Sequence, residues 1–375
     1  MKLSRLVLLI LAIGVVLPLA GELVVRSFPT LLPVNGQIRM QAVMMKDKVK
    51  PDKEIGFVRL PRLHQEVNTM DFSYLRETDS LGFPNRDPWP TRADIVILGD
   101  SLVMGEGTGL DRSFVGRFQA ANPGVKIVNL GIAGAGPDRQ LLAYRKYGTR
   151  LHPSVVLAFL YVAADITNSE HFDRWRKEAP QVDYNRFRLD LGRRKEPHSW
   201  LNRLRLAAVI SNQFDTGAPT GQVVEMADGS SVFLDESTLA YVKQAVTPEK
   251  LERVMRPLAA LQELARGQGA SAYVVLIPSK EEIFARAYSV VNDVRRAFLR
   301  AGIDCLDLYP LVEQTGASRS PYFCRDIHLN DYGSQVVADY LTNWWQRRTA
   351  VVGQPGLKPE RSACVSVFIT RLAHS

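Results

Sequence analysis

The stretch Ile95-Val96-Ile97-Leu98-Gly99-Asp100-Ser101-Leu102 is the most informative part of this chain. Its four aliphatic residues are typical of a strand that is buried on both faces. Such a strand, ending in Gly-Asp-Ser, places a serine at the carboxyl edge of a parallel sheet, where ligands bind, and a following helix N-terminus can stabilise negative charge. Ser101 is therefore a candidate nucleophile, and an ordinary Gly-Asp-Ser turn is the alternative.

Short apolar runs alternate with helical segments on both sides of this strand. We expect strands at 94–98, 125–130, 155–160, 272–277 and 303–306, and helices at 112–121, 139–150, 248–266 and 290–300. Such alternation is typical of βαβ units with a parallel sheet. The sequence predicts an α/β domain over residues 93–348, a three-layer α/β/α arrangement of the flavodoxin-like kind.

Three other segments lack this rhythm. Residues 27–92 are rich in proline and charge and are expected to form a stalk that leads into edge structure. Residues 172–247 are polar and basic, with turn signals at 217–221 and at Asp228-Gly229, and are expected to form an insertion over one edge of the sheet. Residues 349–375 have no sustained period and are expected to be a loose tail.

A histidine motif lies just before the last expected helix. The helix would begin after Asn330 as N-cap and would bury a face from Val336 to Trp345. His328 follows Asp326 at close range on the loop that opens this helix. That setting suits a general base whose second ring nitrogen is oriented by a carboxylate.

The early strand-end serine and the late Asp-x-His together resemble the SGNH/GDSL hydrolase family, over about Gly82 to Trp345. Gly99-Asp100-Ser101-Leu102 is similar to the first family block, which implies that Ser101 is the nucleophile. The run from Asn129 to Gly134 resembles the second block, which implies that Ser101 and Gly134 offer backbone N–H groups to an oxyanion. The last block, Asp326-Ile327-His328, implies His328 as base and Asp326 as its orienter.

Two positions depart from the family pattern. Arg325 stands where the commonest pattern has the aspartate, three residues before the histidine, although Asp-x-His occurs in relatives such as the alginate-acetylation group. Ala163-Ala164-Asp165 stands where Gly-Asn-Asp is typical, so Ala164 lacks the amide that completes the oxyanion hole. Losing one such donor costs on the order of 10²–10³ in rate. Asn168 and Asn129 are candidate replacement donors.

The N-terminus has the pattern of a membrane anchor. Lys2 and Arg5 precede an uncharged run from Leu6 to Gly21, and Leu23 to Val25 extend it. Cations before the run favour a cytoplasmic N-terminus with the rest of the chain, including the catalytic domain, outside the cytoplasm. A cleaved signal peptide is the competing interpretation, but residues 18–21 form a poor small-x-small site. We expect residues 1–26 to remain as a transmembrane helix.

Charge, cysteine and glycine content exclude several other classes. The net charge of +8 is spread along the chain, as on a solvated surface, and no nucleic-acid module is present. Gly131 to Gly136 has the order G-x-x-G-x-G, so it is not the dinucleotide fingerprint, and no nucleotide or other cofactor is expected. The three cysteines show no metal-ligand spacing, so no metal is expected, and a Cys305–Cys324 disulfide is one hypothesis for an oxidising compartment.

These observations predict acyl transfer at Ser101, with three outcomes left open. With water as acceptor the protein is an esterase, and with a sugar hydroxyl it is a polysaccharide O-acetyltransferase. The anchored relatives imply carbohydrate or cell-envelope esters, and the basic insertion would suit an anionic glycan. The missing amide at Ala164 favours the third outcome, a catalytically degenerate glycan-binding or assembly protein.

Overall fold

A parallel sheet of five strands forms the centre of the computed structural model, which describes residues 10–32, 34–45, 47–192, 206, 220–316 and 318–352. The strands are β5 (Ile95–Leu98), β6 (Ile127–Asn129), β7 (Val155–Tyr161), β10 (Ser271–Ile277) and β11 (Cys305–Asp307). Their order in the sheet is β11-β10-β7-β5-β6, and every neighbouring pair is parallel. The α/β fold with a parallel sheet is therefore as predicted.

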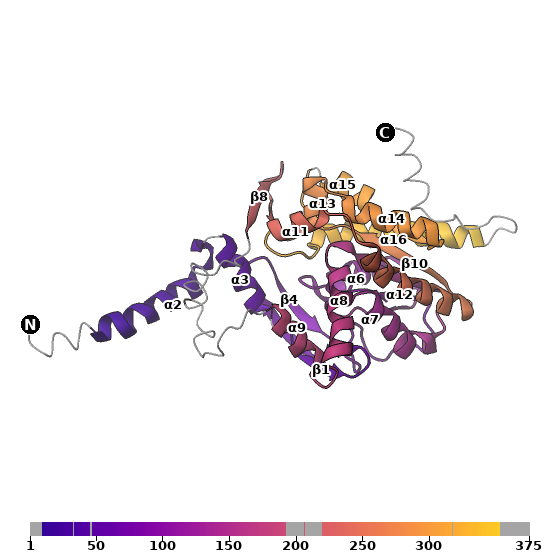
Figure 1. Cartoon of the computed structure of the whole chain (residues 1–375), viewed down its shortest axis with the longest axis horizontal. Coiled ribbons are helices and arrows are strands. Elements are labelled where there is room, and N and C mark those ends of the chain that lie inside the picture. Colours follow the sequence, from indigo (N-terminus) through magenta and orange to yellow (C-terminus); the bar gives the residue numbers. More distant parts are fainter. Residues whose placement is uncertain are drawn as a thin grey trace, which may run out of the picture.

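Helices cover both faces of the sheet (Figure 1). α6 (Phe114–Ala121) packs against α16 (Asp331–Val352), and α12 (Pro248–Gly267) packs against β10 and against three further helices, α7 (Pro137–Ala143), α8 (Val162–Glu178) and α14 (Ser289–Ala301). All seven residues of β7 are buried, because helices lie on both of its faces. The side chain of Asn330 accepts a hydrogen bond from Gly333 N–H at 2.9 Å and caps α16, as expected.

The order in which the chain adds strands to the sheet reverses beside the candidate nucleophile. The chain moves from β5 outward to β6 and then crosses back to β7 on the other side of β5. The loops after β5 and β7 therefore diverge at their carboxyl ends, and ligands bind at such switch points in open α/β sheets. Ser101 follows β5 and α8 follows β7, so both flank this crevice.

Residues 47–92 differ from the expected stalk. They contain two antiparallel hairpins, β1 (Val49–Asp52) with β2 (Gly56–Arg59), and β3 (His64–Asn68) with β4 (Ser73–Glu77). Ile55, Phe57 and Phe83 are at most 1% exposed and belong to the same hydrophobic core as the central sheet. These apolar side chains fix the segment to the α/β domain, because burying them against the sheet removes them from water.

The region expected as an insertion is divided. α8 continues to Glu178, past the expected start at residue 172, and α9 (Tyr184–Gly192) follows it. Residues 193–205 and 207–219, with most of the turn signal at 217–221, lie outside the described residues. The β8 (Gly221–Glu225) and β9 (Ser231–Asp235) hairpin turns at Asp228-Gly229, as predicted, and Phe233 N–H donates to the Cys324 carbonyl at 2.7 Å. The hairpin therefore packs on the histidine loop, and α11 (Glu236–Val242) follows it.

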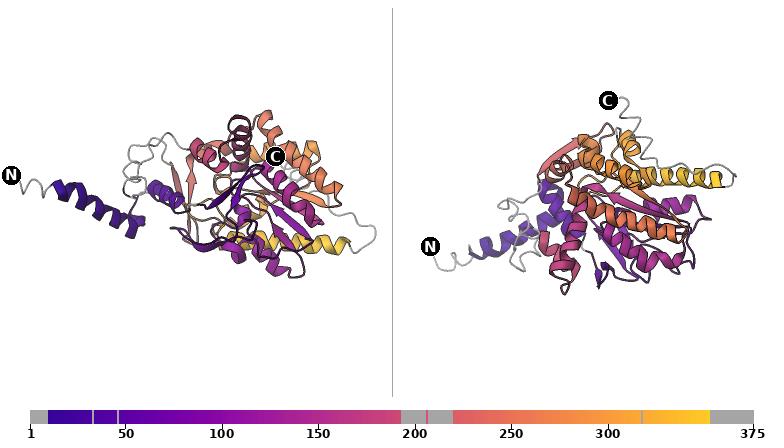
Figure 2. Two further views of the ribbon diagram at one scale, coloured as in Figure 1. Left: turned by 90° about the horizontal axis from the view of Figure 1, so that it is seen from below. Right: turned by 45° about the vertical axis from the view of Figure 1, so that its right-hand side comes forward.

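The N-terminal helical segment extends away from the α/β domain (Figures 1 and 2). It includes a π-helical stretch at Ala12–Val16 and α2 (Leu17–Ser27), and α3 (Val34–Met44) then leads back to the hairpins. Within the described part of the chain, no helix is long and apolar enough to cross a membrane.

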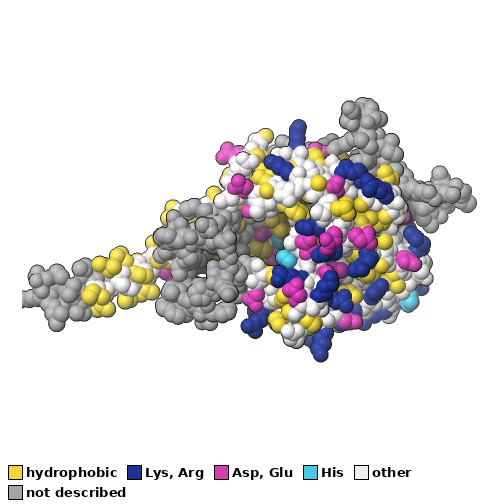
Figure 3. Space-filling view, viewed as in Figure 1, with side chains coloured by type: hydrophobic (Ala, Val, Ile, Leu, Met, Phe, Trp, Pro, Cys, Tyr) yellow, Lys and Arg dark blue, Asp and Glu magenta, His cyan; other side chains and the backbone are white. Residues whose placement is uncertain are grey.

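Two further expectations can be compared with the structure. Cys324 carries a free thiol, so the expected Cys305–Cys324 disulfide is wrong; Cys305 is buried in β11, whereas Cys324 lies on the histidine loop within 3.4 Å of the Ser231 hydroxyl. On the face shown in Figure 3, basic and acidic side chains intermingle and no single sign dominates. α16 continues to Val352, and the rest of the expected tail lies outside the described residues.

Candidate active site

Ser101 is the first residue of a short helix, α4 (Ser101–Met104), directly after β5. Asp100 caps this helix, because its side chain accepts a hydrogen bond from Leu102 N–H at 2.9 Å. Gly99 has no room for a side chain, since a Cβ there would lie 2.3 Å from Val103. The strand, the glycine and the cap together fix the serine at the carboxyl edge of the sheet.

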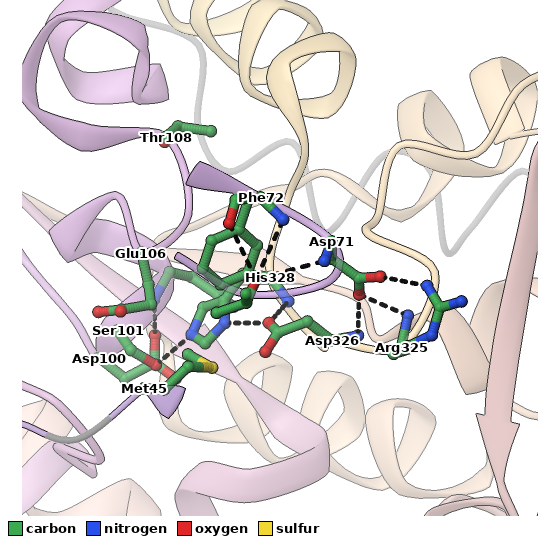
Figure 4. A network of polar contacts seen from close by, with 12 residues as sticks. Met45, Asp71, Phe72, Asp100, Ser101, Glu106, Thr108, Arg325, Asp326 and His328 are labelled. Atoms are coloured by element: carbon green, nitrogen blue, oxygen red, sulfur yellow. Dashed lines mark hydrogen bonds and ion pairs between the residues drawn. The ribbon is translucent and has the colours of Figure 1, made fainter. Parts of the chain in front are cut away.

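Ser101, His328 and Asp326 form a continuous hydrogen-bonded chain (Figure 4). The hydroxyl of Ser101 lies 2.7 Å from His328 Nε2, and the opposite ring nitrogen, Nδ1, is hydrogen-bonded to Asp326. Asp326 also accepts from His328 N–H at 2.9 Å, which fixes the carboxylate to the loop of the base. Two segments that are 227 positions apart in sequence are thus joined in one serine–histidine–aspartate chain, the arrangement that suits a nucleophile, a base and an orienting acid.

The charges around His328 favour its protonated form. Burial acts to lower the pKa of His328, but the charge and hydrogen bond of Asp326, with the charges of Glu106 and Asp100, raise it above its ordinary value. Burial acts to raise the pKa of Asp326, but the charge and hydrogen bonds of His328 lower it overall. An imidazolium at His328 would therefore be stabilised if it took the proton of Ser101.

A carboxylate from the β3–β4 turn holds the loop that carries the base. Asp71 accepts from the backbone N–H groups of Arg325 and Asp326 at 2.7 and 2.9 Å, and from the guanidinium of Arg325 at 2.7 Å. Arg325 also donates to Gln37 of α3 at 2.6 Å. The buried Lys280 of α13 (Lys280–Ala285) supports the loop from inside, donating to the Asp326 carbonyl at 2.9 Å. Arg325 thus supports the loop through its own contacts and does not bond to His328.

A second buried carboxylate, Glu106, holds the loop after the nucleophile. Its backbone N–H donates to the Ser101 carbonyl, and its carboxylate pairs with Arg59 and Arg76 from the two hairpins. Tyr74 donates its hydroxyl to the same carboxylate. Burial acts to raise the pKa of Glu106, but the two guanidinium charges lower it strongly, so it stays ionised beside the histidine.

Two buried carboxyl groups, those of Asp100 and Asp165, lie at the starts of α4 and α8. Asp165 is fully buried in the first turn of α8 and accepts from Tyr161 N–H at 2.9 Å. Burial raises the pKa of Asp165 well above its ordinary value, and the charge of nearby Asp100 raises it further. Burial also raises the pKa of Asp100. This pair helps to fix the starts of α4 and α8, on which Ser101 and Ala164 lie.

The loop after β6 brings Gly134 to the same edge of the sheet. Ile132 N–H donates to the Gly99 carbonyl at 3.0 Å, and Gly134 has a φ of +59°, which glycine adopts without strain. Ala164 offers no polar group. Asn129 is excluded as a replacement donor because its Nδ2 donates to Val103 and its Oδ1 accepts from Gly131. Asn168, one helical turn after Ala164, lies close to Gly134 and donates to Asp165 at 3.3 Å.

The sequence pointed to the three side chains of the hydrogen-bonded chain but to none of their supports. Asp71, Glu106, Arg59 and Arg76 carry no local signal, because their partners lie at distant positions in the chain. No group of His, Cys, Asp and Glu in the described residues could hold a metal ion.

Comparison with known proteins adds likeness to solved structures. No family model and no curated protein matches the chain. A member of the lipolytic G-D-S-L family from Veillonella parvula is 13% identical, with a TM-score of 0.38, over 68% of this chain and 98% of its own. Esterase EstA from Pseudoalteromonas sp. is 11% identical, with a TM-score of 0.36, over 68% and 96%. An acetyl xylan esterase is 14% identical, with a TM-score of 0.35, over 68% of this chain and 98% of its own.

Proposed function

We propose that this protein is a serine hydrolase that acts on ester bonds, with Ser101 as nucleophile, His328 as base and Asp326 as orienting acid. The observation that carries the proposal is the 2.7 Å contact between the Ser101 hydroxyl and His328 Nε2, with Nδ1 bonded to buried Asp326. A serine hydroxyl is a weak nucleophile unless a base takes its proton, and this arrangement provides that base.

The reaction follows from the positions of these groups. As the Ser101 oxygen bonds to the ester carbonyl carbon, His328 Nε2 takes the hydroxyl proton and the carbonyl electrons move to its oxygen. Collapse of this tetrahedral species breaks the bond to the leaving alcohol, which receives the proton from His328. A water or hydroxyl acceptor then repeats the sequence on the acyl-enzyme. Asp326 holds the imidazole in the required tautomer throughout.

The oxyanion would be held by the backbone N–H groups of Ser101 and Gly134. Ser101 is the first residue of α4, where its own backbone N–H has no intrahelical acceptor and the helix dipole favours negative charge. Ala164 removes the side-chain donor that the family normally adds. Because one donor is worth about 3–4 kcal/mol, two backbone donors and the triad leave substantial catalysis.

We further propose that residues 1–26 anchor the protein in a membrane with the catalytic domain outside the cytoplasm. The N-terminal cations support this orientation. The helix from residue 10 onward supports the anchoring, because apolar side chains such as Ile13, Leu17 and Leu23 are 56 to 65% exposed along it. Exposing a continuous apolar surface of this kind to water is unfavourable, and a lipid phase would cover it.

The substrate class we propose is the O-acyl group of a carbohydrate or a cell-envelope polymer. A polysaccharide O-acetyltransferase with the same triad is the alternative, because the acyl-enzyme is common to both and only the acceptor differs. Acetate release from an acetyl ester, measured with and without a candidate glycan, separates the two. A glycan that becomes acetylated while acetate release falls would identify transfer.

Reaction with a fluorophosphonate probe tests whether the protein is an enzyme. We expect Ser101 to be labelled in the wild type, and we expect Ser101→Ala to lose both labelling and hydrolysis of a small acetyl ester. Ser113→Ala is a matched control, because the Ser113 hydroxyl caps α6 and, among the described residues, forms no hydrogen bond with His328. Failure of the wild type to react would favour the catalytically degenerate, glycan-binding protein that Ala164 also favours.

A further inference from the structure

Two guanidinium groups lie against the loop that carries Gly134. Arg139 of α7 is fully buried and donates to four backbone carbonyls, those of Ile55, Phe57, Ala133 and Gly134. Arg188 of α9 lies 5.4 Å from the centre of the Phe57 ring, and Arg139 lies 4.5 Å from it. Two positive charges therefore share one aromatic ring beside the loop.

Neither guanidinium forms an ion pair with a carboxylate of the described residues, although the charges of Asp138 and Asp52 act on Arg139. The acceptors of Arg139 are all neutral carbonyls, and Arg188 has no hydrogen bond or ion pair among the described residues. The nearest acid on α7, Asp138, bonds instead to Ser169 and to a backbone N–H. Burial and the charge of Arg188 together lower the pKa of Arg139 to about 10, against the opposing charges of Tyr184 and Asp138. An anion at this place would relieve that repulsion.

Arg188 occupies the space that glycine leaves at position 134. A Cβ on Gly134 would lie 2.1 Å from Nη1 of Arg188 and 3.6 Å from Oδ1 of Asn168. The same loop packs on the nucleophile helix, because a Cβ on Gly131 would lie 2.9 Å from Met104 N. Arg188 is thus a half-buried, unpaired cation at the carboxyl edge of the sheet, above the loop expected to hold the oxyanion.

We propose that Arg188 binds a negatively charged oxygen of the substrate beside Gly134. The inference rests on the proposed ester chemistry and extends it. The oxygen has two sources: the oxyanion that forms at the attacked carbonyl, where Arg188 would replace the absent amide of Ala164, or a carboxylate carried by an acidic sugar ester. A guanidinium serves both, because charge-assisted hydrogen bonds to oxygen anions are among the strong ones.

The test compares Arg188→Met and Arg188→Lys with Arg186→Met, on a neutral aryl acetate and on an acetylated uronic acid. Arg188→Met should lower kcat/KM by about 10- to 100-fold, the loss expected for one charge-assisted hydrogen bond, and lysine should restore part of it. Arg186 is a matched control, because it is exposed on α9 and its contact is Asp190, 3.9 Å away. Equal melting temperatures would show that the variants are folded.

The two substrates separate the two sources. A loss on both substrates, with recovery in the double variant Ala164→Asn, Arg188→Met, assigns Arg188 to the oxyanion. A loss confined to the uronic acid, in KM, assigns it to the substrate carboxylate. A wild type that labels with fluorophosphonate while Arg188→Met hydrolyses both substrates normally overturns this inference alone. A wild type that neither labels nor hydrolyses overturns the proposed function, and this inference with it.

Discussion

The pKa of His328 would set the pH at which the proposed reaction runs. His328 must be neutral to accept the proton of Ser101, yet three carboxylates, those of Asp326, Glu106 and Asp100, raise its pKa. Because its pKa is raised, His328 becomes fully neutral only at a higher pH than an ordinary histidine does. The benefit is a stronger base and a more stable imidazolium during attack.

Asp326→Asn should therefore change both the rate and its pH dependence. Removing the charge that raises the pKa of His328 moves the acidic limb of kcat/KM toward lower pH, because the imidazole then loses its proton more readily. The rate on the plateau should fall by about 10⁴, as expected when the tautomer is no longer fixed. A pH profile of ester hydrolysis measures both effects, and a limb that stays in place would contradict the assigned partner.

The raised pKa of His328 also makes the free energy of unfolding depend on pH. A group whose pKa is higher in the folded than in the unfolded protein stabilises the fold below its unfolded pKa. That contribution is lost as the pH rises through the folded pKa. In the wild type, the free energy of unfolding should therefore fall as the pH rises from the unfolded to the folded pKa of His328. This fall should be smaller in His328→Gln, as measured by urea unfolding at a series of pH values. An identical pH dependence in both proteins would argue against it.

At the scale of elements, the two N-terminal hairpins complete the catalytic loops. The β3–β4 turn holds the histidine loop through Asp71, and β2 and β4 hold the nucleophile loop through the arginines that pair with Glu106. Arg325 joins this assembly to α3, the helix that follows the proposed anchor. The segment before the catalytic domain is thus part of the active-site support.

Asp71→Asn tests this support. The amide can accept only at its single oxygen, so at least one donor of the Arg325–Asp326 segment loses its partner, at a cost of about 1–3 kcal/mol. We expect reduced stability in urea unfolding and a larger fall in kcat than in KM, because the position of His328 is loosened while substrate contacts remain. Glu66→Gln is the matched control, since Glu66 is exposed on the same hairpin. Equal effects of the two variants would contradict the positioning role.

At the scale of the whole molecule, an apolar helix extends from a domain that carries both basic and acidic side chains on the face shown in Figure 3. The exposed apolar residues of residues 10–24 are contiguous, whereas others such as Leu189 and Leu299 are isolated. Isolated apolar residues are normal on protein surfaces, but a contiguous group of them marks a contact surface.

Aspartate at Ile13, Leu17 and Leu23 should release the protein from membranes. Each charge at the centre of a spanning helix costs about 2.5–3.5 kcal/mol, so three together oppose insertion strongly. We expect the wild type to remain in the membrane pellet after alkaline carbonate extraction and the triple variant to leave it. Leu189→Asp with Leu299→Asp should stay in the pellet, because those exposed side chains lie on the catalytic domain. A wild type found in the supernatant would refute the anchor.

The sequence by itself determined the features that depend on neighbouring residues. Buried strands and helices follow from periodicity, and Ser101 and His328 stood out because each lies at the end of an element in a characteristic local setting. The strand-end serine and the capped helix after Asn330 needed no knowledge of distant contacts.

Tertiary structure alone decided the supports of the site and the place of the N-terminal hairpins. Asp71 reaches a partner 254 positions away, and Glu106 gathers two arginines from strands that precede it by 47 and 30 positions. The sequence also did not show that the Asn129 side chain is hydrogen-bonded to Val103 and Gly131, or that Arg188 lies against Gly134. Local sequence patterns indicate which face of a helix or strand is buried. A long-range ion pair depends instead on how distant loops meet in the folded protein, and no periodic pattern in the sequence indicates it.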